Sequence, residues 1–124
     1  MIVVTNSETS KRVDKYQVSN TAIEIAVRKA ARGLVSADLG GGVIKQRIAR
    51  GNRGASRGCR GIFIVHSSDL FLFVDIFAKS EKENLTAREL DVFTNLAPIF
   101  QKLSQAELLK LAKDNDWKVE TYGP

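Results

Sequence analysis

Residues 43–60 read V-I-K-Q-R-I-A-R-G-N-R-G-A-S-R-G-C-R, and the fold can be predicted outward from them. The alternation of side chains in Val43–Ile48 predicts a β-strand with Lys45 and Arg47 on one face and mainly apolar side chains on the other. Residues 50–58 contain three glycines and three arginines, which predicts a basic hairpin loop. The chain is therefore expected to return through this loop and to pair antiparallel with its own strand.

Two apolar stretches follow the loop. Residues 60–66 and residues 70–77 are almost all apolar, β-branched or aromatic, which is typical of strands buried on both faces. Between them, residues 67–69 read Ser-Ser-Asp and predict a turn. The middle of the chain is therefore expected to form the centre of a sheet.

One helix is predicted before this sheet. Residues 20–32 show helical spacing of apolar side chains, and Thr21 and Glu24 have the spacing of a capping box. Gly33 is placed as the C-terminal stop of this helix. The glycines at residues 40–42 predict a loop that leads into the basic strand.

Two more helices are predicted near the C-terminus. Thr86 with Glu89, and Ser104 with Glu107, each have capping-box spacing ahead of regularly spaced apolar residues. Pro98 lies inside the first of these helices and is expected to kink or interrupt it, because proline lacks the amide donor.

The two ends of the chain are less regular. Residues 1–5 are apolar and β-branched, which predicts an edge strand of the sheet. Residues 6–19 are polar, and a loop, a short helix or a partly mobile segment all fit them. The tail, residues 114–124, either adds a short strand or lies against the core.

Length and composition set limits on the class of protein. With 124 residues and 44% hydrophobic residues, the chain is expected to be a single domain, residues 1–124. Its one cysteine allows neither a disulfide framework nor a cysteine metal cluster, and no metal or cofactor is expected. Neither a membrane span of about 18 apolar residues nor a secretory signal is recognisable, so the expected location is the cytoplasm and no membrane partner is expected.

The positive charge is concentrated in one segment. Residues 43–60 hold six of the 19 basic residues and no acidic residue, so the other 13 basic residues face 14 acidic ones. A short segment that carries the whole net charge of +5 is typical of a surface that binds a polyanion.

The candidates for chemistry follow from this charge. If the strands pair antiparallel, Lys45, Arg47 and Arg60 converge on one sheet face, where they can hold a phosphate and stabilise a phosphoryl transition state. The loop arginines Arg50, Arg53 and Arg57 are expected to contact a nucleic-acid backbone. The charged residues 79–83 follow the last apolar strand and can supply a general acid or base, or else form a charged turn.

Three other residues are candidates for a role in packing. His66, the only histidine, ends an apolar strand and is expected to be structural more often than catalytic. Cys59 has no partner at catalytic spacing and is expected to pack in the core. Asp75 stands in an apolar strand, either as a paired buried acid or facing a partner.

Three motifs follow one another in the chain: A-A-R-G-L-V-S-A-D-L-G-G-G-V-I-K-Q-R-I-A-R (residues 30–50), R-G-C-R (residues 57–60) and F-A-K-S-E-K-E-N-L (residues 77–85). In this order they resemble the RelE/ParE superfamily of bacterial type II toxins, with the RelE/HigB-like branch nearest. The resemblance covers residues 21–113, and residues 1–19 match loosely. It implies a small α+β domain in which helices pack on a curved antiparallel sheet.

The resemblance also implies an activity and partners. It implies a ribosome-dependent mRNA endonuclease that inhibits translation in the decoding site. Cleavage is metal-free and uses the 2′-hydroxyl as nucleophile, leaving a cyclic phosphate and a 5′-hydroxyl. The implied partners are mRNA, the ribosome decoding site and a cognate antitoxin, typically a helix-turn-helix protein.

By position, the resemblance assigns catalytic roles to Lys45, Arg47, Arg60 and Lys79. The chain has Ser80 where some relatives have a second arginine, and Thr86 near the place of a tyrosine that stacks on a base. The general acid and base are therefore open among Glu81, Lys82 and Lys45, with Glu81 counted as catalytic and Lys82 as an RNA contact.

Two other functions remain in competition. A non-catalytic module can bind RNA or the ribosome through the same basic stretch. ParE-like members of the superfamily inhibit gyrase, although these tend to lack the cations matched by Lys45, Arg47 and Arg60.

Overall fold

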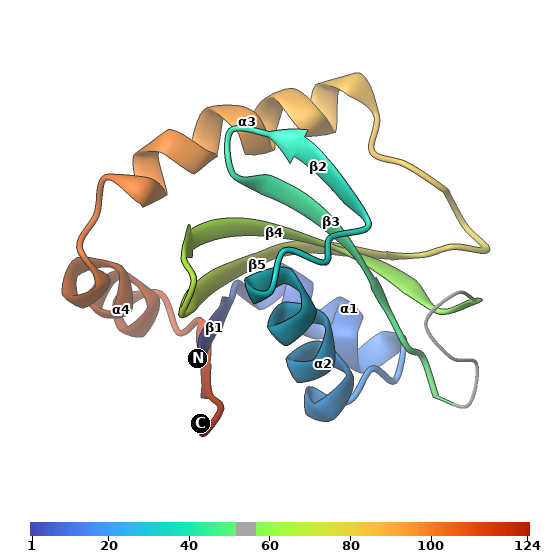
Figure 1. Ribbon diagram of the computed structural model, residues 1–124, viewed down its shortest axis with the longest axis horizontal. Coiled ribbons are helices and arrows are strands. Elements are labelled where there is room, and N and C mark those ends of the chain that lie inside the picture. Colours follow the sequence, from blue (N-terminus) through green and yellow to red (C-terminus); the bar gives the residue numbers. More distant parts are fainter. Residues whose placement is uncertain (52–56) are drawn as a thin grey trace.

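The computed structural model describes residues 1–51 and 57–124, which form a six-stranded sheet between two layers of helices (Figure 1). The strands lie in the order β2-β3-β4-β5-β1-β6. Their bounds are β1 Ile2–Thr5, β2 Ala37–Gly40, β3 Val43–Ile48, β4 Cys59–Ser67, β5 Leu70–Ala78 and β6 Lys118–Thr121. The helices are α1 Ser7–Lys15, α2 Asn20–Ala31, α3 Ala87–Gln101 and α4 Gln105–Asp114. The expected small α+β fold is confirmed.

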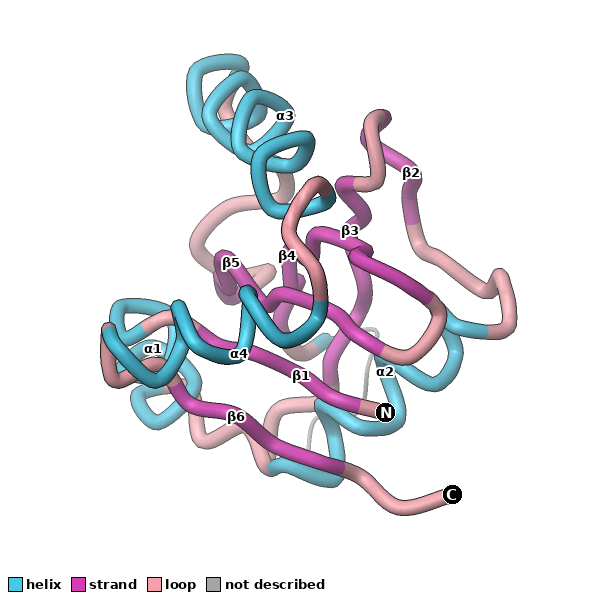
Figure 2. Tube along the Cα trace, turned by 90° about the vertical axis from the view of Figure 1, so that its left-hand side faces the viewer, coloured by secondary structure: helices cyan, strands magenta, loops and turns pink. Residues whose placement is uncertain are grey.

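The central hairpins are those predicted. β3 pairs antiparallel with β4, which places Arg47 opposite Arg60, and β4 pairs antiparallel with β5. β4 and β5 are buried on both faces, as their continuous apolar composition indicated. The two helices α1 and α2 cover one face of the sheet, and α3 and α4 cover the other (Figures 1 and 2).

Each face of the sheet has its own hydrophobic core. The core under α1 and α2 is centred on Phe63 and Phe73, whose rings are stacked with centroids 4.4 Å apart. The core under α3 and α4 contains Ile62, Ile64 and Leu108, all fully buried. Because successive residues of β4 point to opposite faces, this strand contributes to both cores.

The edge position predicted for residues 1–5 is wrong. β1 lies inside the sheet, parallel to β5 on one side and antiparallel to β6 on the other. The tail supplies β6, and this pairing covers the edge that β1 would otherwise expose. The undecided residues 6–19 contain helix α1, which starts because the Asn6 side chain accepts a hydrogen bond from the Thr9 amide at 2.8 Å.

Helix α2 begins at Asn20, as predicted, but its N-cap lies two residues before the predicted capping box. Ser19 is the N-cap and accepts from the Ala22 amide at 3.1 Å, so the proposed Thr21–Glu24 box is wrong. Glu24 pairs instead with Arg28, one turn along the helix. Gly33 ends the helix with φ +82°, as predicted for a C-terminal stop.

Strand β2 was not predicted. Its sequence Ala-Asp-Leu-Gly has low β propensity, but it pairs antiparallel with β3 through the turn at Gly41 and Gly42. Both turn glycines have positive φ, a conformation that other residues rarely adopt. The expected loop at residues 40–42 is therefore the turn of a hairpin.

Both C-terminal capping boxes are confirmed, at Thr86 and at Ser104. The predicted interruption at Pro98 is wrong, because α3 continues through it to Gln101. Pro98 removes one amide donor, whereas the neighbouring Ala97 is fully buried against the sheet and holds the helix in place. No helix in the described part of the chain has the length and apolar character needed to cross a membrane.

Candidate functional site

Basic side chains from three segments line one cavity, here called the basic cavity, of about 290 Å³. It lies where β3, β4 and the segment after β5 meet. In the described part of the chain, its lining consists of four cations, one carboxylate and two neutral polar residues: Lys45, Arg47, Arg60, Lys79, Glu83, Ser36 and Asn84. The predicted convergence of strand cations is thus present, together with Lys79.

Arg60 is the most buried cation of the cavity, with only 7% of its surface exposed. Its Nη1 donates to the Cys59 carbonyl at 3.2 Å. Burial lowers the pKa of Arg60, the charge of Arg47 lowers it further, and the Glu83 carboxylate opposes this effect. A guanidinium placed in this way favours an anion beside it.

Three side chains connect strand β3 to the neighbouring segments. Lys45 Nζ donates to Asn84 Oδ1 at 2.7 Å, which connects the strand to the segment after β5. On the opposite face, Gln46 is buried and donates to the carbonyls of Ala26 and Leu34. Ser36 Oγ accepts from the Arg47 amide at 3.1 Å. These contacts hold strand β3 in the position from which Lys45 and Arg47 reach the cavity.

The segment after β5 brings one lysine and one carboxylate to the cavity. The Lys79 amide donates to the Gly58 carbonyl at 3.1 Å and so extends the pairing of β4 with β5. Glu83 lines the cavity near Arg60. Sequence reasoning considered the whole charged run and selected Glu81. It could not recognise that Glu83 lines the cavity, because alternation along a strand does not predict side-chain directions in the turn that follows.

Glu81 does not line the basic cavity. Its Oε2 accepts from the Tyr16 hydroxyl at 2.8 Å, on the sheet face covered by α1. Arg50 lies on the same side: its guanidinium is 5.0 Å from the centre of the Tyr16 ring, and its Nε donates to the Tyr16 carbonyl at 3.2 Å. Through Tyr16, Glu81 and Arg50 therefore connect the end of α1 to the segments that follow the C-terminal ends of β5 and β3.

Two other predicted RNA contacts, Lys82 and Arg57, are absent from the described lining of the cavity. Lys82 Nζ donates to both carboxylate oxygens of Glu89, at 2.7 and 2.8 Å, and lies 5.0 Å from the centre of the Phe77 ring. Arg57 is exposed just before β4. Arg53 falls outside the described residues.

His66, Cys59 and Asp75 are all absent from the described lining of the basic cavity. His66 Nε2 lies 2.7 Å from the Leu103 carbonyl, beside α3 and away from the basic cavity. Cys59 is fully buried, and burial raises the pKa of its thiol. Asp75 is a paired buried acid, because Arg12 Nη1 binds its carboxylate.

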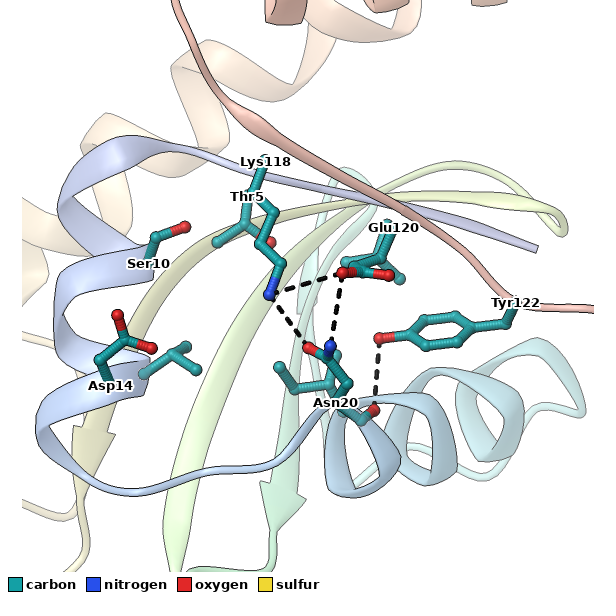
Figure 3. Close-up of a pocket in the computed structure, with 10 residues that line it drawn as sticks. Thr5, Ser10, Asp14, Asn20, Lys118, Glu120 and Tyr122 are labelled. Carbon is teal, nitrogen blue, oxygen red and sulfur yellow. Dashed lines mark hydrogen bonds and ion pairs between the residues drawn. The ribbon is translucent and has the colours of Figure 1, made fainter.

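A second, smaller cavity of about 70 Å³ lies among α1, α2, β1 and β6 (Figure 3). Four of its polar residues, Asn20, Lys118, Glu120 and Tyr122, bind one another. Asn20 lies 3.1 Å from Lys118 Nζ and 3.3 Å from a Glu120 oxygen, and its carbonyl accepts from the Tyr122 hydroxyl at 3.3 Å. These contacts join the C-terminal strand to the start of α2.

Comparison with known families agrees with this arrangement. The model of the family described as "RelE toxin of RelE / RelB toxin-antitoxin system" matches residues 1–118, including the N-terminal residues that resembled it only loosely. No individual curated protein gives a significant match. A match over nearly the whole chain, together with the α+β fold, shows that the protein belongs to the RelE family of toxins from toxin–antitoxin systems.

Proposed function

We propose that this toxin is a ribosome-dependent mRNA endonuclease that inhibits translation, with residues 1–124 forming one catalytic domain. The observation that carries the proposal is the convergence of Lys45, Arg47, Arg60 and Lys79 on the basic cavity. The family match supports a toxin with an antitoxin partner, and the cations supply the chemistry that cleavage of a phosphodiester needs.

The proposed reaction is attack of the 2′-oxygen on the adjacent phosphorus, which gives a cyclic phosphate and a 5′-hydroxyl. Negative charge on the phosphoryl oxygens increases in the transition state. Preorganised cations stabilise that charge, and a guanidinium matches two phosphate oxygens at once. We assign this role to Arg60 and Arg47, which lie opposite each other on paired strands.

The finer parts of the proposal rest on the sequence motifs. Residues 30–50, 57–60 and 77–85 favour the HigB-like branch, whose antitoxins are typically helix-turn-helix proteins. An antitoxin can neutralise the toxin by covering the basic cavity or by blocking access to the ribosome. We place the action in the cytoplasm at the decoding site, with Arg50, Arg53, Arg57 and Lys82 as contacts to RNA.

The test is cleavage of a short mRNA on programmed ribosomes by the wild type and by Arg60→Ala. Removal of one preorganised donor to the transition state is expected to lower the cleavage rate by about 100-fold or more. Lys113→Ala is the control, because it removes one exposed positive charge from α4, outside the cavity. Circular dichroism verifies that the Arg60 variant is folded.

The possible outcomes separate the competing functions. Cuts that vanish in Arg60→Ala and persist in Lys113→Ala support the endonuclease. Tight ribosome binding by the wild type without cuts contradicts it and favours a non-catalytic binding module. Absence of both binding and cuts directs the next assay to gyrase.

A further inference from the structure

In the described lining of the basic cavity, one side chain, the Glu83 carboxylate, is suited to accept a proton at neutral pH. Attack by the 2′-oxygen requires a base that removes the 2′-hydroxyl proton. The four cations of the cavity are donors in their protonated forms, and the hydroxyl of Ser36 and the amide of Asn84 are not basic. Among the described residues of the lining, the remaining side chain is the Glu83 carboxylate.

Two of the residues that the sequence suggested for a role in catalysis, Glu81 and His66, lie elsewhere. The Glu81 carboxylate accepts from the Tyr16 hydroxyl on the face covered by α1. The imidazole of His66 lies beside the Leu103 carbonyl. Neither residue lines the cavity that holds the cations.

The backbone explains why two glutamates two residues apart are used differently. The chain leaves β5 through a turn in which the amides of Glu81 and Lys82 both donate to the Ala78 carbonyl. The turn directs Glu81 to Tyr16, and the segment then crosses to the cavity, where Asn84 accepts from Lys45. Glu83 follows Lys82 and precedes this Asn84, lines the cavity and lies near Arg60, so its carboxylate stands on the side of the cavity where a phosphate bound by Arg60 is expected.

We propose that Glu83 is the general base of the cleavage reaction, an inference that rests on the proposed function. The Glu83 carboxylate takes the proton from the 2′-hydroxyl as the bond from the 2′-oxygen to phosphorus forms. The bond from phosphorus to the 5′-oxygen breaks, and a lysine ammonium of the cavity, Lys45 or Lys79, supplies the proton to that oxygen. The protonated glutamate and neutral lysine then regain their starting states by proton exchange with water.

An alternative role for Glu83 is to balance the charge of the four cations. The two roles predict opposite results for Glu83→Gln. If the carboxylate only offsets cations, its removal strengthens the attraction for phosphate and leaves the rate unchanged or higher. If it is the base, the rate falls although substrate binds as well as before or better.

The experiment is single-turnover cleavage of mRNA on programmed ribosomes across a range of pH, with ribosome affinity measured in parallel. We expect Glu83→Gln to lower the rate by about 100-fold or more, the usual contribution of a general base. We also expect the wild-type rate to fall at acidic pH and this fall to be absent in Glu83→Gln. Glu107→Gln is the control, because glutamine also serves the capping box of α4, outside the cavity.

Glu81→Gln gives the competing assignment a direct test. If this variant, rather than Glu83→Gln, loses the acidic limb of the pH profile, the assignment of Glu83 is overturned. The assignment is also overturned if Glu83→Gln cleaves at the wild-type rate with the wild-type profile, while the endonuclease proposal stands. A wild type that does not cleave refutes both proposals.

Discussion

Asp75 shows how one side chain in an apolar strand is accommodated. Its Oδ1 binds Arg12 Nη1 and accepts from the Ile76 amide at 2.9 Å. Burial raises the pKa of Asp75, while Arg12 and the Ile76 amide oppose that rise. Because the folded-state pKa exceeds the unfolded value of about 4, protonation stabilises the fold. That stability is fully present below about pH 4 and is lost as the pH rises through the folded-state pKa.

Replacement of Asp75 by asparagine tests this balance. Asparagine keeps an oxygen that can accept from Arg12 and Ile76, but it removes the charge that burial penalises. We expect the stability of Asp75→Asn relative to the wild type to increase as the pH rises from about 4 to about 7. Urea unfolding at both pH values measures the difference. A relative stability that decreases over this range would show that the ion pair with Arg12 dominates instead.

At the scale of elements, the contact between β4 and the core under α1 and α2 depends on Gly61. A Cβ atom at this position would lie 2.5 Å from Ile48 Cδ1, 2.9 Å from the Phe63 ring and 3.1 Å from the Phe73 ring. The two rings are stacked and cannot both move aside without disturbing the core. The absence of a side chain at Gly61 therefore leaves room for the stacked rings of Phe63 and Phe73, next to Arg60 in β4.

Gly61→Ala is expected to destabilise the protein by about 1–3 kcal/mol, the usual cost of overpacking a core. Urea unfolding measures the free energy of unfolding. Gly123→Ala is the matched control, because a Cβ there would meet nothing within 4 Å, and its effect should be close to zero. Equal stabilities for the wild type and Gly61→Ala would mean that the core repacks around the added methyl group.

At the scale of the whole molecule, the two ends of the chain are joined in the sheet. β6 pairs with β1, and the Tyr122 hydroxyl just beyond it donates to the Asn20 carbonyl at the start of α2. Burial raises the pKa of Tyr122 to about 12, with smaller contributions from Glu120 and Glu24. Ionisation of this phenol in the folded state would place a negative charge beside two carboxylates. The attachment of the C-terminal strand through Tyr122 is therefore expected to weaken at alkaline pH.

The sign of this effect gives a prediction for Tyr122→Phe. The contribution of Tyr122 to stability is fully present below pH 10, the usual tyrosine value, and is lost as the pH rises through about 12. Because the phenol is only partly buried, solvent screening reduces the loss to about 1 kcal/mol. Tyr122→Phe lacks this titration, so its stability should fall less steeply over that range in urea unfolding. Parallel curves for the two proteins would contradict the raised pKa.

Much of the fold follows from residues that are close together in the chain. The strands of the central hairpins, both C-terminal capping boxes and the stop at Gly33 depend on neighbours within a few positions, and all were predictable. The grouping of Lys45 with Arg47 follows in the same way from the two-residue period of a strand. The family resemblance added Lys79, which no local pattern distinguishes from the other charges after β5.

The tertiary structure decided what depends on segments far apart in the chain. The inner position of β1 requires pairing with the last strand, and the strand character of residues 37–40 comes from pairing with β3. The place of Glu83 in the basic cavity, with Glu81 on the opposite face, depends on the turn after Ala78 and on contacts to Tyr16 and Lys45. The sequence by itself determined the elements and the location of the charge, because local periodicity and capping encode them. Only long-range packing selected which of those charged side chains share one cavity.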